Sequence, residues 1–249
     1  MSVVRDIASA VRLLTVIPLG AAEGSRPVRY FPLVGWMFAG IAVGIASGAV
    51  ALGRASGTGA VLVATVIVSA WALTAGFLHW DGLADCADAF GVRGDAQRRL
   101  AVMRESGIGA FGVVAIVLVA AVQVSAAAVV VDSGAWWALG AAPVVGRLSA
   151  ALALMTRTPA RADGLAARYA RRESVPGWIV LAVPVVALAA VGPLAARAIA
   201  LGGAILIAGL VPGLFARRLG GITGDVLGAS VLLVEAFVLT IGALAGSAL

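Results

Sequence analysis

The sequence predicts an all-α polytopic membrane protein with about seven transmembrane helices, an N-terminal amphipathic helix and a functional site at the cytoplasmic face. Three observations predict this class. Of the 249 residues, 62% are hydrophobic and 12% are charged, whereas soluble domains carry about 25% charged residues. Apolar runs recur along the whole chain, and arginines gather in alternate connections between them. The pattern favours a single integral-membrane domain, residues 1–249, and excludes a domain with water on all sides.

The apolar runs define the expected spans, because about 20 helical residues cross a bilayer. Glycine and proline are frequent within them, as transmembrane helices tolerate and small-residue packing favours. The expected spans are residues 33–53, 58–79, 109–131, 135–156, 177–196, 198–215 and 226–248. Before them, Asp6 and Arg12 interrupt an apolar stretch that Pro18 ends. We interpret this first segment as an interfacial helix and not as a signal peptide.

The arginines orient the bundle. All 18 basic residues are arginine, and the segments rich in them are expected to face the cytoplasm. These segments carry Arg5, Arg12, Arg26 and Arg29; Arg93, Arg98, Arg99 and Arg104; Arg157, Arg161, Arg168, Arg171 and Arg172; and Arg217 and Arg218. The opposite connections hold Arg54, Asp132 and Arg197. The sequence therefore predicts a multi-pass protein of the cell (plasma) membrane whose polar clusters share the cytoplasmic side.

The stretch "HWDGLADCADAFG" carries the clearest chemistry. In a helix, Asp81, Asp85 and Asp88 fall at i, i+4 and i+7 and share one face. Adjacent carboxylates repel one another unless a cation neutralises them, and sites built from carboxylate oxygens suit Mg²⁺ or Mn²⁺. Mg²⁺ usually binds one or two carboxylates together with phosphate oxygens, so this face predicts a phosphate-bearing substrate. The alternative is a solvated acidic loop.

Residues after this stretch could bind the phosphate. Arg93, Arg98 and Arg99 lie within reach as guanidinium clamps. The stretch "RESGIGAFG" then supplies Ser106 and glycines at the start of the third span, where free backbone N–H groups bind anions.

Four other residues have open alternatives. Arg147 lies inside the fourth span, where an ionisable residue indicates function unless it extends to the interface. Asp225, in "GGITGDVLGA", either contributes to the site or caps the last helix. His79 is either a base or a buried hydrogen-bonding partner. The single cysteine, Cys86, excludes an intramolecular disulfide and is more plausible as a packing residue than as a nucleophile.

Four motifs occur together in a family-specific order. They are "HWDGLADCADAFG", "RRLAVMRESGIGAFG", "VVGRLSA" and "GGITGDVLGA", and "RYFPLVGWMFAG" precedes them. The chain resembles the cobalamin synthase family, the adenosylcobinamide-GDP ribazoletransferases, over about residues 10 to 240. The resemblance implies an integral-membrane, Mg²⁺-requiring enzyme of late cobalamin biosynthesis. It would join adenosylcobinamide-GDP to α-ribazole, or to α-ribazole 5′-phosphate, and release GMP.

The resemblance suggests roles for the candidate residues. Mg²⁺ would be held by Asp81, Asp85, Asp88 and Asp225. Asp88, or otherwise His79, would take the proton of the ribazole 3′-hydroxyl. The substrate would be bound by Arg98, Arg99, Arg104, Ser106, Arg147 and Asp225. The expected partners are the two substrates and the lipid bilayer, with no nucleic acid. The small-residue helix faces fit packing within one chain or in a homo-oligomer.

Two other classes of membrane protein are alternatives to this one. A membrane phosphotransferase of the CDP-alcohol type also uses several aspartates with Mg²⁺, but "DGLAD" lacks the arginine that its motif requires. A transporter would place polar residues near the centres of its spans, whereas the sequence gathers them at one face.

Overall fold

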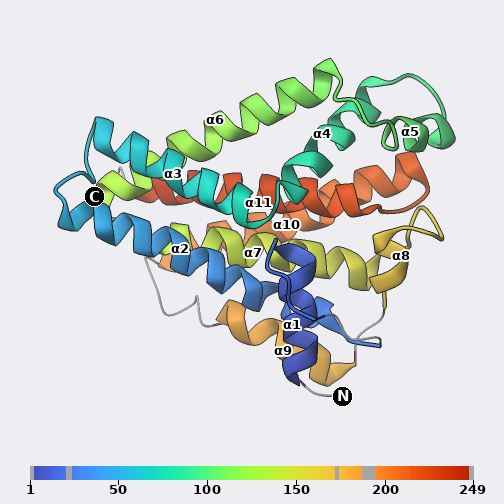
Figure 1. Cartoon of the computed structure of the whole chain (residues 1–249), viewed down its shortest axis with the longest axis horizontal. Helices are drawn as coiled ribbons and strands as arrows, with labels where there is room; N and C mark the ends of the chain where they lie inside the picture. Colours follow the sequence, from blue (N-terminus) through green and yellow to red (C-terminus); the bar gives the residue numbers. More distant parts are fainter. Residues whose placement is uncertain (1–2, 21–23, 172–173, 187–193, 247–249) are drawn as a thin grey trace.

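The chain folds into a bundle whose long helices run mainly along one axis (Figure 1). The computed structural model describes residues 3–20, 24–171, 174–186 and 194–246. Its helices are α1 (Val3–Leu14), the 3-10 helix η1 (Pro27–Tyr30), α2 (Phe31–Ala51), α3 (Thr58–Thr74), α4 (Leu78–Gly91), α5 (Ala96–Val102), α6 (Ala110–Ser133), α7 (Trp137–Thr156), α8 (Leu165–Tyr169), α9 (Val175–Val186), α10 (Leu194–Leu219) and α11 (Gly224–Gly246). This part of the chain contains no strand, only one isolated β-bridge, so the predicted all-α class is confirmed.

Five segments of the described chain are long and apolar enough to cross a membrane. They are α2 with η1, α6, α7, α10 and α11; α3 and α4 together make a sixth, bent by 88°. The predicted count of seven is therefore not confirmed. The second expected span breaks after α3, because Gly76 and Phe77 both have a φ of 59°, a conformation that does not continue a helix. The fifth, 177–196, includes residues 187–193, which lie outside the described residues.

Helices α7 and α11 form the centre of the bundle. In the most apolar window of each helix, 89% of α7 and 78% of α11 is buried, against 28% of α6 and of α10. The outer helices expose large apolar side chains such as Val117 and Leu118 on α6 and Leu206 on α10. Apolar side chains on an outer surface suit contact with lipid.

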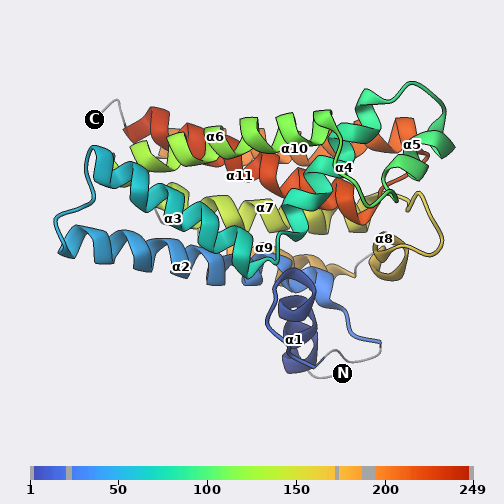
Figure 2. The ribbon, with the colours of Figure 1, turned by 45° about the horizontal axis from the view of Figure 1, so that its top comes forward.

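The connections segregate to two ends, as the arginine pattern predicts. The views in Figures 1 and 2 place α5 and α8 at one end and the last turn of α11 at the other. At the arginine-rich end, Arg104 pairs with Asp163 at 3.4 Å. At the arginine-poor end, the Gly57 N–H donates to the Asp132 carboxylate at 3.1 Å. Helix α1 lies across the bundle axis in both views.

Glycines let α4 and α11 cross with their backbones in contact. A Cβ atom at Gly82 would lie 2.7 Å from the Asp225 carbonyl oxygen, and one at Gly228 would lie 3.1 Å from the His79 Cα. A side chain at Gly82 would therefore force the helices apart. This crossing brings the two acidic motifs, distant in sequence, side by side.

Candidate functional site

A cavity of about 200 Å³, here called the inner cavity, lies where α4, α11 and the connection between α7 and α8 meet. Its polar lining is His79, Asp81, Arg161, Thr223 and Asp225. The rest is apolar and includes side chains from α1, α2, α8 and α11. Two predicted aspartates and the predicted histidine thus share one cavity with a cation.

The isolated β-bridge assembles this lining. The Ala160 N–H donates to the Ile222 carbonyl at 2.8 Å, and the Ile222 N–H donates to the Thr158 carbonyl at 2.9 Å. Gly221 permits the contact, because a Cβ atom there would lie 2.5 Å from the Ala160 nitrogen. The bridge holds the residue after Ala160, Arg161, beside the start of α11.

Thr223, and not Asp225, caps α11. The Thr223 Oγ1 accepts a hydrogen bond from the Val226 N–H at 3.3 Å, which is the usual N-cap interaction. The same hydroxyl lies 3.1 Å from Oδ2 of Asp225 and donates to it. The alternative in which Asp225 is only an N-cap is therefore wrong, and Asp225 lines the inner cavity.

The acidic residues lie close enough to interact. Asp85 is half-buried and experiences the charges of Asp81, Asp88 and Asp225. Arg161 is a cation that acts on both Asp85 and Asp225. Within the described residues, no three His, Cys, Asp or Glu side chains are arranged to hold a metal ion. The lining of the inner cavity offers two carboxylates, which suits Mg²⁺ bound jointly with phosphate.

Arg161 stands between two cavities. Its Nη2 donates to the Leu100 carbonyl at 2.9 Å, but its buried Nε–H finds no partner in the described part of the chain. A buried donor without a partner costs free energy, and an anion would satisfy it. Arg161 also lines an outer cavity of about 580 Å³ together with Gln97, Leu100, Ala101, Arg104 and Glu105. The sequence had indicated only a topological role for Arg161.

His79 is buried in the wall of the inner cavity. Neither ring nitrogen has a hydrogen-bond partner among the residues that the structure describes. A neutral imidazole always offers one acceptor nitrogen. His79 is thus an unpartnered imidazole in the cavity wall, and both of its nitrogens are buried.

Asp88 instead caps another helix. Its two carboxylate oxygens accept the N–H groups of Gly109 at 2.7 Å and Gly112 at 2.9 Å, at the start of α6. The predicted anion site at this helix start exists, but the chain's own carboxylate occupies it. Asp88 does not line the inner cavity, and Ser106 is exposed in the preceding loop.

The predicted arginine clamps also have other partners. Arg99 donates to the Ala89 carbonyl at 2.5 Å and to the Phe90 carbonyl at 3.3 Å, at the end of α4. Such contacts satisfy the last carbonyls of a helix. Arg98 is exposed and lies 3.9 Å from Glu105. Arg104 is exposed too, but it lines the outer cavity.

Arg147 lines neither of these two cavities and lies in the bundle interior, close enough to His79 for its charge to act on the imidazole. It forms a buried ion pair with Glu235 of α11, and its guanidinium carbon lies 3.9 Å from the centre of the Phe38 ring. Gln123 of α6 donates to the Leu232 carbonyl of α11 at 3.2 Å and lies close enough to act on Glu235. The expectation that Arg147 binds substrate finds no support in this placement. Glu235 was missed, although a carboxylate inside "VLLVEAFVL" needs a partner in a membrane span.

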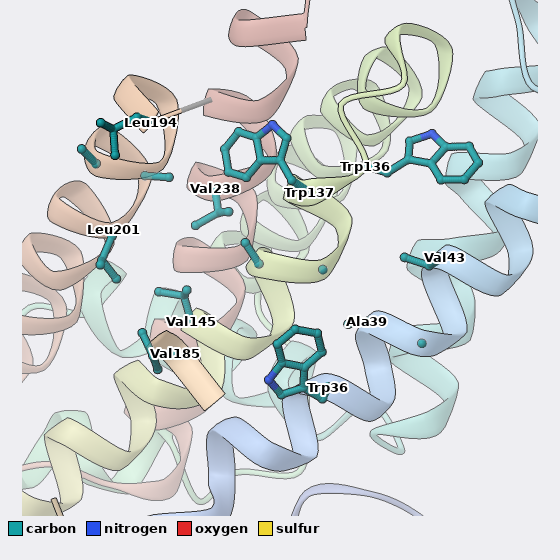
Figure 3. A pocket seen from close by; sticks show the side chains of 15 residues that line it. Trp36, Ala39, Val43, Trp136, Trp137, Val145, Val185, Leu194, Leu201 and Val238 are labelled. Carbon is teal, nitrogen blue, oxygen red and sulfur yellow. The ribbon is translucent and has the colours of Figure 1, made fainter. Parts of the chain in front are cut away.

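Another cavity, of about 560 Å³, lies between α2, α7, α9, α10 and α11 (Figure 3). Trp36, Trp137, Leu201 and Val238 are among its lining residues. Its described lining contains no charged side chain. It is therefore unsuited to phosphate chemistry.

Comparisons with known proteins identify the family of the chain. The chain matches the family model for cobalamin-5-phosphate synthase over residues 6–243. It is 35% identical to an adenosylcobinamide-GDP ribazoletransferase of Ralstonia pickettii (strain 12J) over 240 residues, which cover 93% of this chain and 92% of the relative. The protein of that name from Pseudomonas putida (strain GB-1) is 36% identical over 236 residues, 91% of this chain and 93% of the relative. No solved structure shows significant similarity.

Proposed function

This chain belongs to the cobalamin-5-phosphate synthase family of cobalamin biosynthesis, and we propose that it transfers adenosylcobinamide phosphate to α-ribazole or α-ribazole 5′-phosphate. The donor is adenosylcobinamide-GDP. The ribazole 3′-oxygen forms a bond to the phosphorus next to the cobinamide arm, and the bond from that phosphorus to GMP breaks. The observation that carries the proposal is the inner cavity, where two carboxylates face a guanidinium with an unsatisfied donor.

The residues of the inner cavity fit Mg²⁺ bound jointly with substrate. Asp81 and Asp225 supply two carboxylates, the number that Mg²⁺ commonly takes when phosphate oxygens complete its coordination. Asp85 lies close by, within range of the charges of both carboxylates. When bound, Mg²⁺ polarises the attacked phosphorus and neutralises charge on the departing phosphate.

Two further residues complete the proposed chemistry. The Arg161 guanidinium binds a phosphate oxygen through its Nε–H, which otherwise has no partner in the described chain. His79 accepts the proton of the ribazole 3′-hydroxyl. This assignment replaces Asp88 as the preferred base, because both of its oxygens already accept backbone N–H groups.

The protein is proposed to lie in the cell membrane, with the inner cavity on the cytoplasmic side. Arg161 of its lining belongs to an arginine-rich connection, and such connections stay on the cytoplasmic side. Helix α1 lies across the bundle, as an interfacial helix would. Both substrates are water-soluble and would reach the site from that side.

The test is GMP release by the purified protein in detergent with adenosylcobinamide-GDP, α-ribazole and Mg²⁺. Asp81→Asn and Asp225→Asn should each lower kcat by roughly 100- to 1000-fold, the usual loss when one preorganised charged or polar group is removed. Asp132→Asn, at the opposite end of the bundle, is the control and should keep kcat. Intact substrates with the wild-type protein, or near-normal kcat in both cavity variants, would contradict the proposal.

A further inference from the structure

We propose that the inner cavity is the subsite for the base of the acceptor nucleoside, and that the donor binds on the other side of Arg161, at the outer cavity. This inference rests on the proposed function and deepens it. It divides the site between the two substrates, with Arg161 at the boundary because it lines both cavities.

Size favours this division. The inner cavity has a volume of about 200 Å³ and is enclosed by α1, α2, α4, α8 and α11. A planar bicyclic base with a ribose is of this scale, whereas a corrin macrocycle with its amide side chains is several times larger. The outer cavity, of about 580 Å³, is bounded by α5 and Arg161 and is more open. The bulky donor therefore fits only on the outer side.

The chemistry of the two linings points the same way. The inner cavity has an apolar wall that includes Leu13, Leu14, Phe31, Leu227 and Val231. The benzimidazole base of ribazole is largely hydrocarbon and has no N–H donor, so it loses little when buried there. Guanine has several donors and acceptors, and burying them without partners would be costly.

The outer lining is polar and suits the guanosine end of the donor. Gln97, Arg104 and Glu105 offer hydrogen-bond donors and acceptors there. Within the inner cavity, the polar groups come from α4, the start of α11 and the connection before α8. A ribose directed toward Asp81 and Asp225 would place its hydroxyls near His79 and the phosphate held by Arg161.

Helix α1 thus gains a role in substrate binding. Its last two residues, Leu13 and Leu14, form part of the apolar wall. Two hydrogen bonds fix its position: the Arg26 N–H donates to Asp6 at 2.8 Å, and the Val16 N–H donates to the Thr74 carbonyl at 2.9 Å. The N-terminal segment is a wall of the inner cavity as well as a candidate membrane anchor.

Gly164→Leu tests the assignment by filling the inner cavity. Gly164 lines it with a φ of −91°, so any residue tolerates this backbone. A Cβ atom there would meet only the Arg161 Cβ, at 4.0 Å. The KM for α-ribazole should rise roughly 10- to 100-fold, as occlusion of an apolar pocket produces, while the KM for adenosylcobinamide-GDP stays at the wild-type value. Ala162→Leu is the control, because Ala162 is exposed and lines neither cavity.

A second variant covers the case in which Gly164→Leu does not fold. Leu13→Ala shortens the half-buried side chain of the apolar wall and should raise the same KM by a smaller factor. A rise in the KM for adenosylcobinamide-GDP alone, or no change in either KM, would overturn the division while the transferase function stands. Absence of GMP release by the wild-type protein would instead remove the proposed function itself.

Discussion

Two polar clusters of this bundle differ in the surroundings of their charged side chains. In the interior, Arg147 and Glu235 pair with each other. At the arginine-rich end, Asp81 and Asp225 face the inner cavity beside Arg161, whose buried Nε–H has no partner in the described chain. The Arg147 Nε–H also has no partner in the described chain, so the clusters differ in the buried ion pair of the first and in the cavity beside the second. Only the second cluster is open to a ligand.

The difference follows from the cost of burying charge. A lone charge inside a membrane span is expensive, so ionisable residues there pair with one another or line a cavity. The interior pair joins α7 to α11, and Gln123 connects it to α6. The cavity residues lie near the ends of their elements, where a phosphate and a cation could enter. The interior cluster is therefore the candidate for a structural role, and the cavity cluster is the functional candidate.

Breaking the interior pair should have the largest effect on stability. Glu235→Leu leaves the Arg147 guanidinium buried without its counter-charge, and loss of one partner of a buried pair costs about 3–5 kcal/mol. The double variant Arg147→Met/Glu235→Leu removes both charges and should recover most of this loss. Thermal unfolding in detergent, followed by size-exclusion chromatography, measures both effects.

The double variant also tests where the chemistry lies. If the interior pair only holds helices together, the folded double variant should release GMP at nearly the wild-type kcat. A well-folded but inactive double variant would show that Arg147 acts in the reaction, and the contrast between the two clusters would fail.

Asp88→Asn should lower the free energy of unfolding by an intermediate amount and should affect kcat less. The carboxylate accepts two backbone N–H groups, whereas an amide would direct its own N–H₂ at one of them. Leaving one such group unsatisfied costs about 1–3 kcal/mol. Asp81→Asn should leave the unfolding temperature unchanged, because Asp81 is exposed to the cavity. Equal unfolding temperatures for the two variants would contradict the capping role.

The sequence predicted those site residues whose positions follow from local spacing along a helix. Helical periodicity was enough to group Asp81, Asp85 and Asp88. The local sequence also indicated His79 and Asp225, and the motif resemblance suggested their roles. Arg161 could not be predicted, because its position depends on a bridge between Pro159 and Ile222, which are distant in sequence. Spacing alone also could not show that nearby backbone groups would engage Asp88 and Arg99.

The fold, like the site, could be predicted from the sequence only in part. The apolar runs predicted the long helices α2, α6, α7 and α11, but hydropathy could not reveal the break between α3 and α4. Apolar residues continue through Gly76 and Phe77, and only their positive φ values turn the chain. The close crossing at Gly82 was equally hidden, because a glycine needed for backbone contact looks like any other glycine in a membrane span.

A third group of charges, exposed at the arginine-rich end, should show the smallest effects. Arg98 and Glu105 have side chains 60% and 61% exposed, with a separation of 3.9 Å, and such surface pairs contribute at most about 1 kcal/mol. Arg98→Gln should therefore change neither the unfolding temperature nor either KM. Arg104→Gln is its matched partner, because Arg104 is also exposed but lines the outer cavity. It should raise the KM for adenosylcobinamide-GDP by a few-fold at low salt and by less at high salt, since salt screens exposed charges. Identical KM values for the two variants would contradict a role of Arg104 in binding the donor at the outer cavity.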